Sequence, residues 1–191
     1  MSRKLEDYFD QIVVTDFTPE SAEKFRKAVI EESLVNEKLP ITIYIDSHGG
    51  DVESLTTMVE VLESVPNPLH TVCVGKAMSA GAILLAFGDV RYCGEYSTVM
   101  VHEFSGGAMG HTDDVINEAK ELKRLNTLWY DRMAKWCGLK DYKDFKAKLK
   151  NVLGRELYLD ANRAREFGIV DHVGVPKVSL KSRKVRNRRR K

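Results

Sequence analysis

Residues 40–75 read PITIYIDSHGGDVESLTTMVEVLESVPNPLHTVCVG, and this stretch decides the fold. After Pro40 an apolar run, 41–45, leads into the polar and glycine-rich segment DSHGG. Apolar residues at helical spacing then extend from residue 51 to about residue 64, and a second apolar run covers 70–75. A strand, a helix and another strand in this order favour a parallel β-α-β unit.

The same alternation extends over most of the chain. Thr18 can cap a helix that has Pro19 at its first position and buries Phe25 and Val29. A Gly/Ala/Ser-rich element begins near Ser79. Further strands are expected at 11–15, 90–93, 98–102 and 169–173, and further helices at 113–136 and 159–167. The predicted fold class is therefore α/β.

Length and composition are those of one ordinary globular domain. The chain has 191 residues, of which 43% are hydrophobic and 30% charged, and this excludes a wholly disordered or collagen-like protein. No apolar run approaches the roughly 20 residues that cross a bilayer, and the first ten residues, MSRKLEDYFD, do not read as a secretory signal. The three cysteines form neither a disulfide framework nor a metal-ligand pattern. We expect a cytoplasmic, reducing setting and no metal or cofactor.

Basic residues are concentrated at the C-terminus. Residues 177–191 contain nine lysines and arginines and no acid, so the rest of the chain is net negative although the whole carries +2. We expect one folded domain over 1–174 and a solvated, disordered tail over 175–191. Such a tail can also bind nucleic acid or an acidic surface, but without an aromatic residue it does not suggest base stacking.

The segment Gly75 to Ala82 surrounds one serine, Ser79, with small residues. Glycine and alanine at a strand-to-helix junction allow a sharp turn that presents the hydroxyl to a substrate. A helix N-cap in a tightly packed turn explains the pattern equally well.

His102 supplies a base for that serine. It ends the apolar run 98–102, at the edge of a parallel sheet where catalytic groups gather, and histidine can take the proton of a serine hydroxyl. Alone, it could simply end a strand. The pair Gly49-Gly50 can expose backbone N–H groups to an anion, or can form a tight turn without a ligand.

One long helix, 113–136, carries an apolar stripe. Its members follow one another in steps of three or four residues: Val115, Ala119, Leu122, Leu125, Trp129, Met133 and Trp136. The pattern favours a helix that faces the core over one that faces a partner.

Taken together, these segments resemble the ClpP family of self-compartmentalised serine peptidases. The resemblance is carried by IYIDSHGG (43–50), GKAMSAGA (75–82), VMVH (99–102) and the region 157–171, and it spans roughly residues 10 to 174. It implies a crotonase-like fold of repeated ββα units with a protruding handle helix. It also implies a serine endopeptidase that cleaves peptides or unfolded proteins.

The resemblance assigns roles to individual residues. Ser79 falls on the family's nucleophile and His102 on its general base. Gly50 and Ala80 fall on the positions whose N–H groups form the oxyanion hole. The family's aspartate is matched here by Glu156, two residues before Tyr158, so the third member departs from the pattern.

Several alternatives remain open beside this assignment. Asp160 or an acid-independent dyad could replace Glu156, and His48 stands where the family usually has proline. A catalytically weak ring subunit beside an active paralogue, or a phage capsid-maturation protease, would also fit. Acyl-CoA chemistry on the shared crotonase fold is disfavoured by the pair Ser79 and His102.

The family assembles as two stacked heptameric rings around a closed chamber, and 106–110 with 113–136 match the handle where the rings meet. A homo-oligomer without membrane association is therefore expected. No phosphate-binding Gly-Lys-Ser/Thr loop is present, so ATP use requires a partner such as an AAA+ unfoldase. The short segment before the first strand argues against that docking. The compact form and arginine-rich tail resemble relatives carried by bacteriophages.

Overall fold

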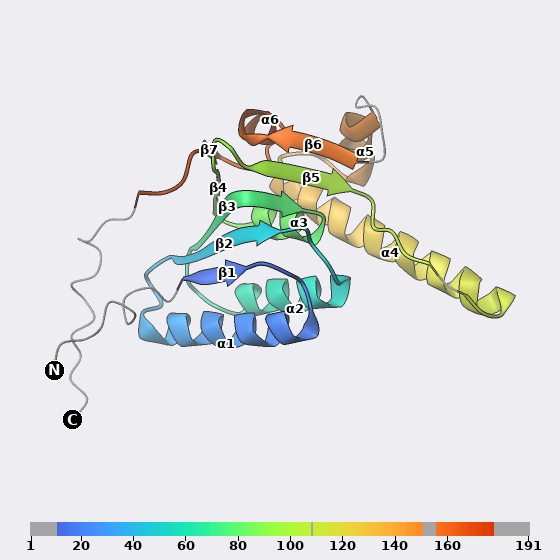
Figure 1. Ribbon diagram of the computed structural model, residues 1–191, viewed down its shortest axis with the longest axis horizontal. Helices are drawn as coiled ribbons and strands as arrows, with labels where there is room; N and C mark the ends of the chain where they lie inside the picture. The colour runs from blue at the N-terminus through green and yellow to red at the C-terminus, as the bar shows by residue number, and fades with distance from the viewer. Residues whose placement is uncertain (1–10, 108, 151–155, 178–191) are drawn as a thin grey trace.

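The computed structural model describes residues 11–107, 109–150 and 156–177, and within them one mixed sheet forms the centre of the molecule (Figure 1). The order β1-β2-β3-β4-β7 makes one path, while β5 pairs with β3 and with β6. The strands are β1 (Ile12–Val14), β2 (Ile41–Ser47), β3 (Leu69–Met78), β4 (Val90–Cys93), β5 (Thr98–His102), β6 (Glu156–Asp160) and β7 (His172–Val173).

Helices pack beside this sheet in a connected series: α1 contacts α2, α2 contacts α3, and α3 contacts α4. The same order is visible in Figure 1, where α4 projects well beyond the body. The helices are α1 (Pro19–Val35), α2 (Val52–Glu63), α3 (Ala80–Phe87), α4 (Thr112–Trp136), α5 (Tyr142–Lys150) and α6 (Ala161–Glu166). The α/β class predicted from the sequence is confirmed.

Local signals explain where several elements begin. Thr18 caps α1, its side chain accepting a hydrogen bond from the Ser21 N–H at 3.2 Å, with Pro19 at the first helical position as predicted. Asp51 caps α2 and accepts a 2.8 Å bond from the Ser54 N–H. The apolar side of α1 is buried through Phe25 and Val29.

Strand β3 is longer than predicted and serves two neighbours. Its first part, His70 to Cys73, pairs with β4, and its second part, Lys76 to Met78, pairs with β5. Gly75 lies between the two parts with φ 81°, a value that favours glycine, and a side chain there would meet the Asp46 carboxylate. The strand therefore changes partners and ends directly before Ser79.

One helix predicted at the C-terminal end needs correction. The helix expected over 159–167 begins only at Ala161, because residues 156–160 form β6, which runs antiparallel to β5. Alternation of exposed and buried residues along β6 is the two-residue period of a strand. Helix α5 was not predicted. The basic tail and the segment before β1 lie mostly or wholly outside the described residues.

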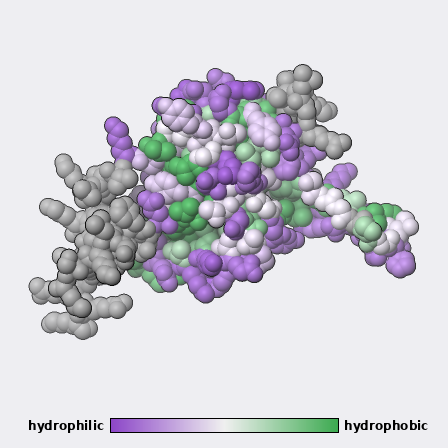
Figure 2. Space-filling model, viewed as in Figure 1, coloured by the Kyte–Doolittle hydropathy of each residue, from purple (hydrophilic) through white to green (hydrophobic). Residues whose placement is uncertain are grey.

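Helix α4 has two unlike halves. Trp129 and Met133, of the predicted stripe, are buried in the core, and Leu122 packs partly against it. Val115 and Ala119, toward the projecting end, are exposed, so the expectation of a core-facing helix is wrong for that half. Figure 2 shows apolar surface on this projecting arm, where Val115, Ile116 and Met109 are exposed.

None of the helices in the described ranges combines the length and the apolar character that crossing a membrane requires.

Candidate active site

Ser79 lies at the turn where β3 passes into α3. Its backbone has φ 53° and ψ −119°, and it is the one non-glycine residue with positive φ in the part of the chain that the structure describes. Its N–H donates a 2.9 Å hydrogen bond to the Met100 carbonyl, which ties the turn to the neighbouring strand β5. Strained backbone of this kind is characteristic of a serine presented on a sharp strand-to-helix turn.

His102 lies against this serine. Its Nε2 is 2.8 Å from the Ser79 Oγ, within hydrogen-bond reach. The sheet accounts for the meeting, because β5 pairs with β3 up to Met78 and Met100, and His102 follows two residues later. A serine hydroxyl and a neutral imidazole at this distance can act as nucleophile and general base.

Gly49 and Gly50 bring backbone close to the same turn. Their φ values, 97° and 153°, lie in the range that favours glycine. A Cβ on Gly49 would lie 2.7 Å from the Ser79 Cβ, and one on Gly50 would lie 2.6 Å from the Phe17 oxygen. Neither position has room for a side chain, because Gly49 packs closely against Ser79 and Gly50 packs closely against Phe17.

Two backbone donors are free near the serine. Ala80 is the first residue of α3, where an N–H has no acceptor in its own helix. Within the described ranges, no backbone carbonyl accepts from the Ala80 N–H or the Gly50 N–H. Unpaired N–H groups at a helix start can receive negative charge on a substrate oxygen.

Glu156 is brought to His102 by strand register but does not bind its ring here. The two residues are directly opposite in the antiparallel pair β5–β6, which places both side chains on one face of the sheet. The Glu156 carboxylate is exposed and accepts a 2.9 Å hydrogen bond from the Tyr158 hydroxyl. This bond raises the pKa of Tyr158.

Asp160 is placed far from His102. It stands opposite Thr98, four residues from His102 along β5, or about 13 Å at the usual strand rise. Its carboxylate caps α6 by accepting from the Arg163 N–H at 2.9 Å. The register therefore favours Glu156 over Asp160 as the acid nearest His102.

The other histidines occupy other places. His48 is exposed on the loop before Gly49, and His70 lies near the start of β3. His111 precedes α4, and His172 on β7 stacks on Tyr92 with ring centroids 4.9 Å apart. Among the described residues, no group of three or more His, Cys, Asp or Glu side chains is arranged to hold a metal ion.

Residues 7–177 match the Clp protease family. The chain belongs to the Clp protease family. The resemblance drawn from the sequence is confirmed, and the match covers both the Ser79 turn and the strand that carries His102. Clp protease membership implies peptidase activity, and the family typically forms oligomeric rings.

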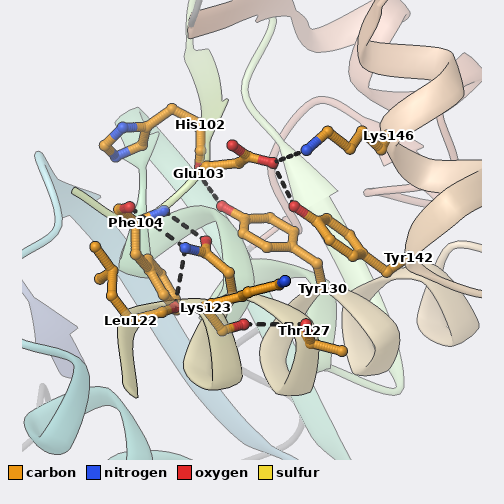
Figure 3. A network of polar contacts seen from close by, with 10 residues as sticks. His102, Glu103, Phe104, Leu122, Lys123, Thr127, Tyr130, Tyr142 and Lys146 are labelled. Carbon is orange, nitrogen blue, oxygen red and sulfur yellow. Dashed lines mark hydrogen bonds and ion pairs between the residues drawn. The ribbon is translucent and has the colours of Figure 1, made fainter. Parts of the chain in front are cut away.

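Sequence reasoning missed the helix side chains that reach the end of β5 in this Clp protease. The Tyr130 hydroxyl donates a hydrogen bond to the His102 carbonyl (Figure 3), and Asn126 bonds the backbone of Phe104. Their i, i+4 spacing places both on one face of α4. Nothing local in the sequence marks them, because their partners lie more than twenty residues away.

Proposed function

We propose that this protein is a serine endopeptidase of the ClpP type. The observation that carries the proposal is the 2.8 Å contact between His102 Nε2 and Ser79 Oγ, at a turn whose backbone is strained. Membership of the Clp protease family supports the same chemistry.

In the proposed mechanism the Ser79 Oγ attacks the scissile carbonyl while His102 Nε2 takes the hydroxyl proton. The Gly50 and Ala80 N–H groups receive the negative charge on the carbonyl oxygen. The C–N bond then breaks, and His102 gives its proton to the leaving amine. In the second half, His102 takes a proton from water, whose oxygen attacks the acyl ester. His102 then gives this proton to the Ser79 oxygen as the C–O bond of the ester breaks, which releases a carboxylic acid and restores the Ser79 hydroxyl.

Glu156 is the proposed third member of the site. Its register opposite His102 supports this role, since a carboxylate on the same face can orient the imidazole and stabilise its positive form. A change of side-chain rotamer from Tyr158 toward His102 would complete the arrangement.

The proposed substrates are peptides and unfolded proteins. Gly106 and Gly107 follow the end of β5 outside any helix or strand, and backbone of this kind can pair with a substrate as an added strand without reading its side chains. The exposed apolar residues of α4, Val115 and Ile116, support a homo-oligomer in which this helix serves as the handle between rings. Three free, buried cysteines suit a reducing, cytoplasmic setting.

Covalent labelling tests the nucleophile. A fluorophosphonate probe should modify wild-type protein at Ser79 and leave Ser79→Ala unmodified, with the labelled peptide identified by mass spectrometry. Ser64→Ala, on the C-cap serine of α2, whose hydroxyl donates to the carbonyl of Val61, is the matched control and should label normally. A folded wild-type protein that does not label at Ser79 would contradict the proposal.

One observation favours a second candidate, a catalytically weak ring subunit beside an active paralogue. Glu156 is exposed and its carboxylate is bound to Tyr158 instead of His102. Peptide hydrolysis by the purified protein, alone and mixed with an active ClpP paralogue, separates the two. Robust turnover by the protein alone excludes the weak subunit.

A further inference from the structure

Three carbonyls in β5 and directly after it are held in different ways. Carbonyls two residues apart in a strand point to the same side, so those of Met100 and His102 share an edge of β5, and Phe104 follows two residues beyond the end of the strand. The Met100 oxygen accepts from the Ser79 N–H at 2.9 Å. That is the last contribution from the β3 side, since β3 pairs with β5 only as far as Met78 and Met100.

Helix α4 supplies the next two partners. The Tyr130 hydroxyl donates to the His102 carbonyl, and the Asn126 amide donates to the Phe104 carbonyl at 3.4 Å while accepting from its N–H at 2.7 Å. Figure 3 shows Tyr130 reaching up from α4 to the His102 backbone, while the imidazole extends to the other side. Side chains of α4 thus continue the hydrogen bonding that β3 leaves unfinished.

Tyr130 is built to be a fixed donor. It is 1% exposed, and its ring lies among those of Phe104, Tyr142 and Phe145, with centroids 5.5 to 5.8 Å away. Burial raises the pKa of Tyr130, so its hydroxyl keeps its proton at any ordinary pH. A side chain held on all sides has little freedom to move, and neither has the carbonyl that it binds.

We propose that Tyr130 is a positioning residue for His102, a role that rests on the proposed function above. Val101 and His102 extend beyond the last β3 partner, so the backbone that carries the imidazole depends on the Tyr130 hydroxyl for its place on that edge. The 2.8 Å contact to Ser79 tolerates little displacement before proton transfer fails.

The first test is Tyr130→Phe, which removes the hydroxyl and keeps the ring. We expect kcat for a peptide substrate to fall by about 10-fold to 100-fold with KM nearly unchanged, as for a catalytic group displaced by about an ångström. Tyr142→Phe is the matched control. Its hydroxyl belongs to the same ring cluster but donates to the Glu103 carboxylate, so kcat should stay within about twofold of wild type.

The second test asks whether Tyr130 acts through His102. On an activated ester, His102→Ala should retain measurable catalysis from the remaining site. Adding Tyr130→Phe to that variant should cause no further loss, because there is no imidazole left to position. A further tenfold loss in the double variant, or equal losses in Tyr130→Phe and Tyr142→Phe, would overturn the proposal.

A third measurement needs no Tyr130 variant and applies even if Tyr130→Phe does not fold. With ¹³C-carbonyl histidine, the difference between wild type and His102→Ala isolates the infrared band of the residue-102 carbonyl. A band lowered by a strong hydrogen bond supports the proposal, and the frequency of a free carbonyl overturns it. If the wild type is active and Tyr130→Phe has unchanged activity, only this inference is rejected. If the wild-type protein does not label at Ser79, the proposed function itself is rejected.

Discussion

Ser79 and Glu156, the first and last members of the proposed site Ser79–His102–Glu156, are held in unlike ways. Ser79 makes two contacts with β5: its N–H donates to the Met100 carbonyl, and its Oγ lies within hydrogen-bond reach of the His102 ring. Ser79 directly follows β3, and both β3 and β5 have neighbouring strands on each side in the sheet. Glu156 lies at the first residue of the edge strand β6, exposed, with its carboxylate on Tyr158. The proposed nucleophile and base are placed by the parallel sheet, whereas the proposed acid has an exposed side chain that is bonded to Tyr158.

The largest expected effect is the loss of the base. His102→Ala should lower kcat by about 10⁵-fold to 10⁶-fold, because Ser79 then has no group to accept its proton. Steady-state hydrolysis of a fluorogenic peptide measures this. His70→Ala, on the same sheet but at the far end of β3, should keep activity within about twofold. Comparable losses in both variants would show that His102 is not the base.

Glu156→Gln tests the role of the exposed carboxylate directly. We expect kcat to fall by about 10³-fold, less than the roughly 10⁴-fold typical of a buried triad acid, because the Glu156 carboxylate is exposed and water can take its place beside the half-buried imidazole. Tyr158→Phe should cost at most a few-fold, since it frees the carboxylate instead of removing it. An unchanged kcat in Glu156→Gln would assign the chemistry to a Ser79–His102 dyad.

Gly49→Ala tests how tightly Ser79 is held, because it adds a methyl group beside that residue. The new methyl group would lie 2.7 Å from the Ser79 Cβ at a residue with φ 97°, so the turn must shift. We expect about a 100-fold loss in kcat. Gly81→Ala, in the first turn of α3, adds a methyl group 3.6 Å from its nearest neighbour and should be tolerated. If Gly49→Ala labels and turns over like wild type, the close packing of the Gly49 backbone on Ser79 is not needed.

The smallest effect concerns the segment that leads from α6 into β7. Arg91 binds Asp171 at 2.6 Å and also donates to the Trp136 and Gly168 carbonyls, and this pairing lowers the pKa of Asp171. A lowered pKa stabilises the fold above the unfolded value near 4, and this contribution disappears as the pH falls through the folded value. Asp171→Asn should therefore cost about 1 kcal/mol at pH 7, a modest figure because the carboxylate is partly exposed.

Urea unfolding at pH 7 and at about pH 3 measures that difference, which should shrink at the lower pH. Glu23→Gln is the control. The pKa of Glu23 is lowered to about 2 by Arg26 and Lys27, but this pair lies on the open surface of α1, so little change in stability is expected. Activity of folded Asp171→Asn should be nearly that of wild type, since Ser79 and His102 do not depend on this segment. A larger loss of activity than of stability would contradict this separation.

Much of this molecule follows from local pattern. The strand-helix-strand order of 40–75, the cap at Thr18 and the small-residue turn at Ser79 are set by backbone preferences and by apolar periods of two and about 3.6 residues. Those signals act over a few neighbours along the chain, so the sequence alone determined the α/β class and named the serine and the histidine as partners.

Only tertiary structure decided which distant groups meet. The antiparallel register of β6 sets Glu156 opposite His102 and places Asp160 opposite Thr98, far from His102. Packing divides α4 into a buried half and a projecting half. The contact from Tyr130 to the His102 carbonyl spans 28 residues of chain. No local preference encodes such a contact, because it exists only once the sheet and helix have packed together and buried both groups.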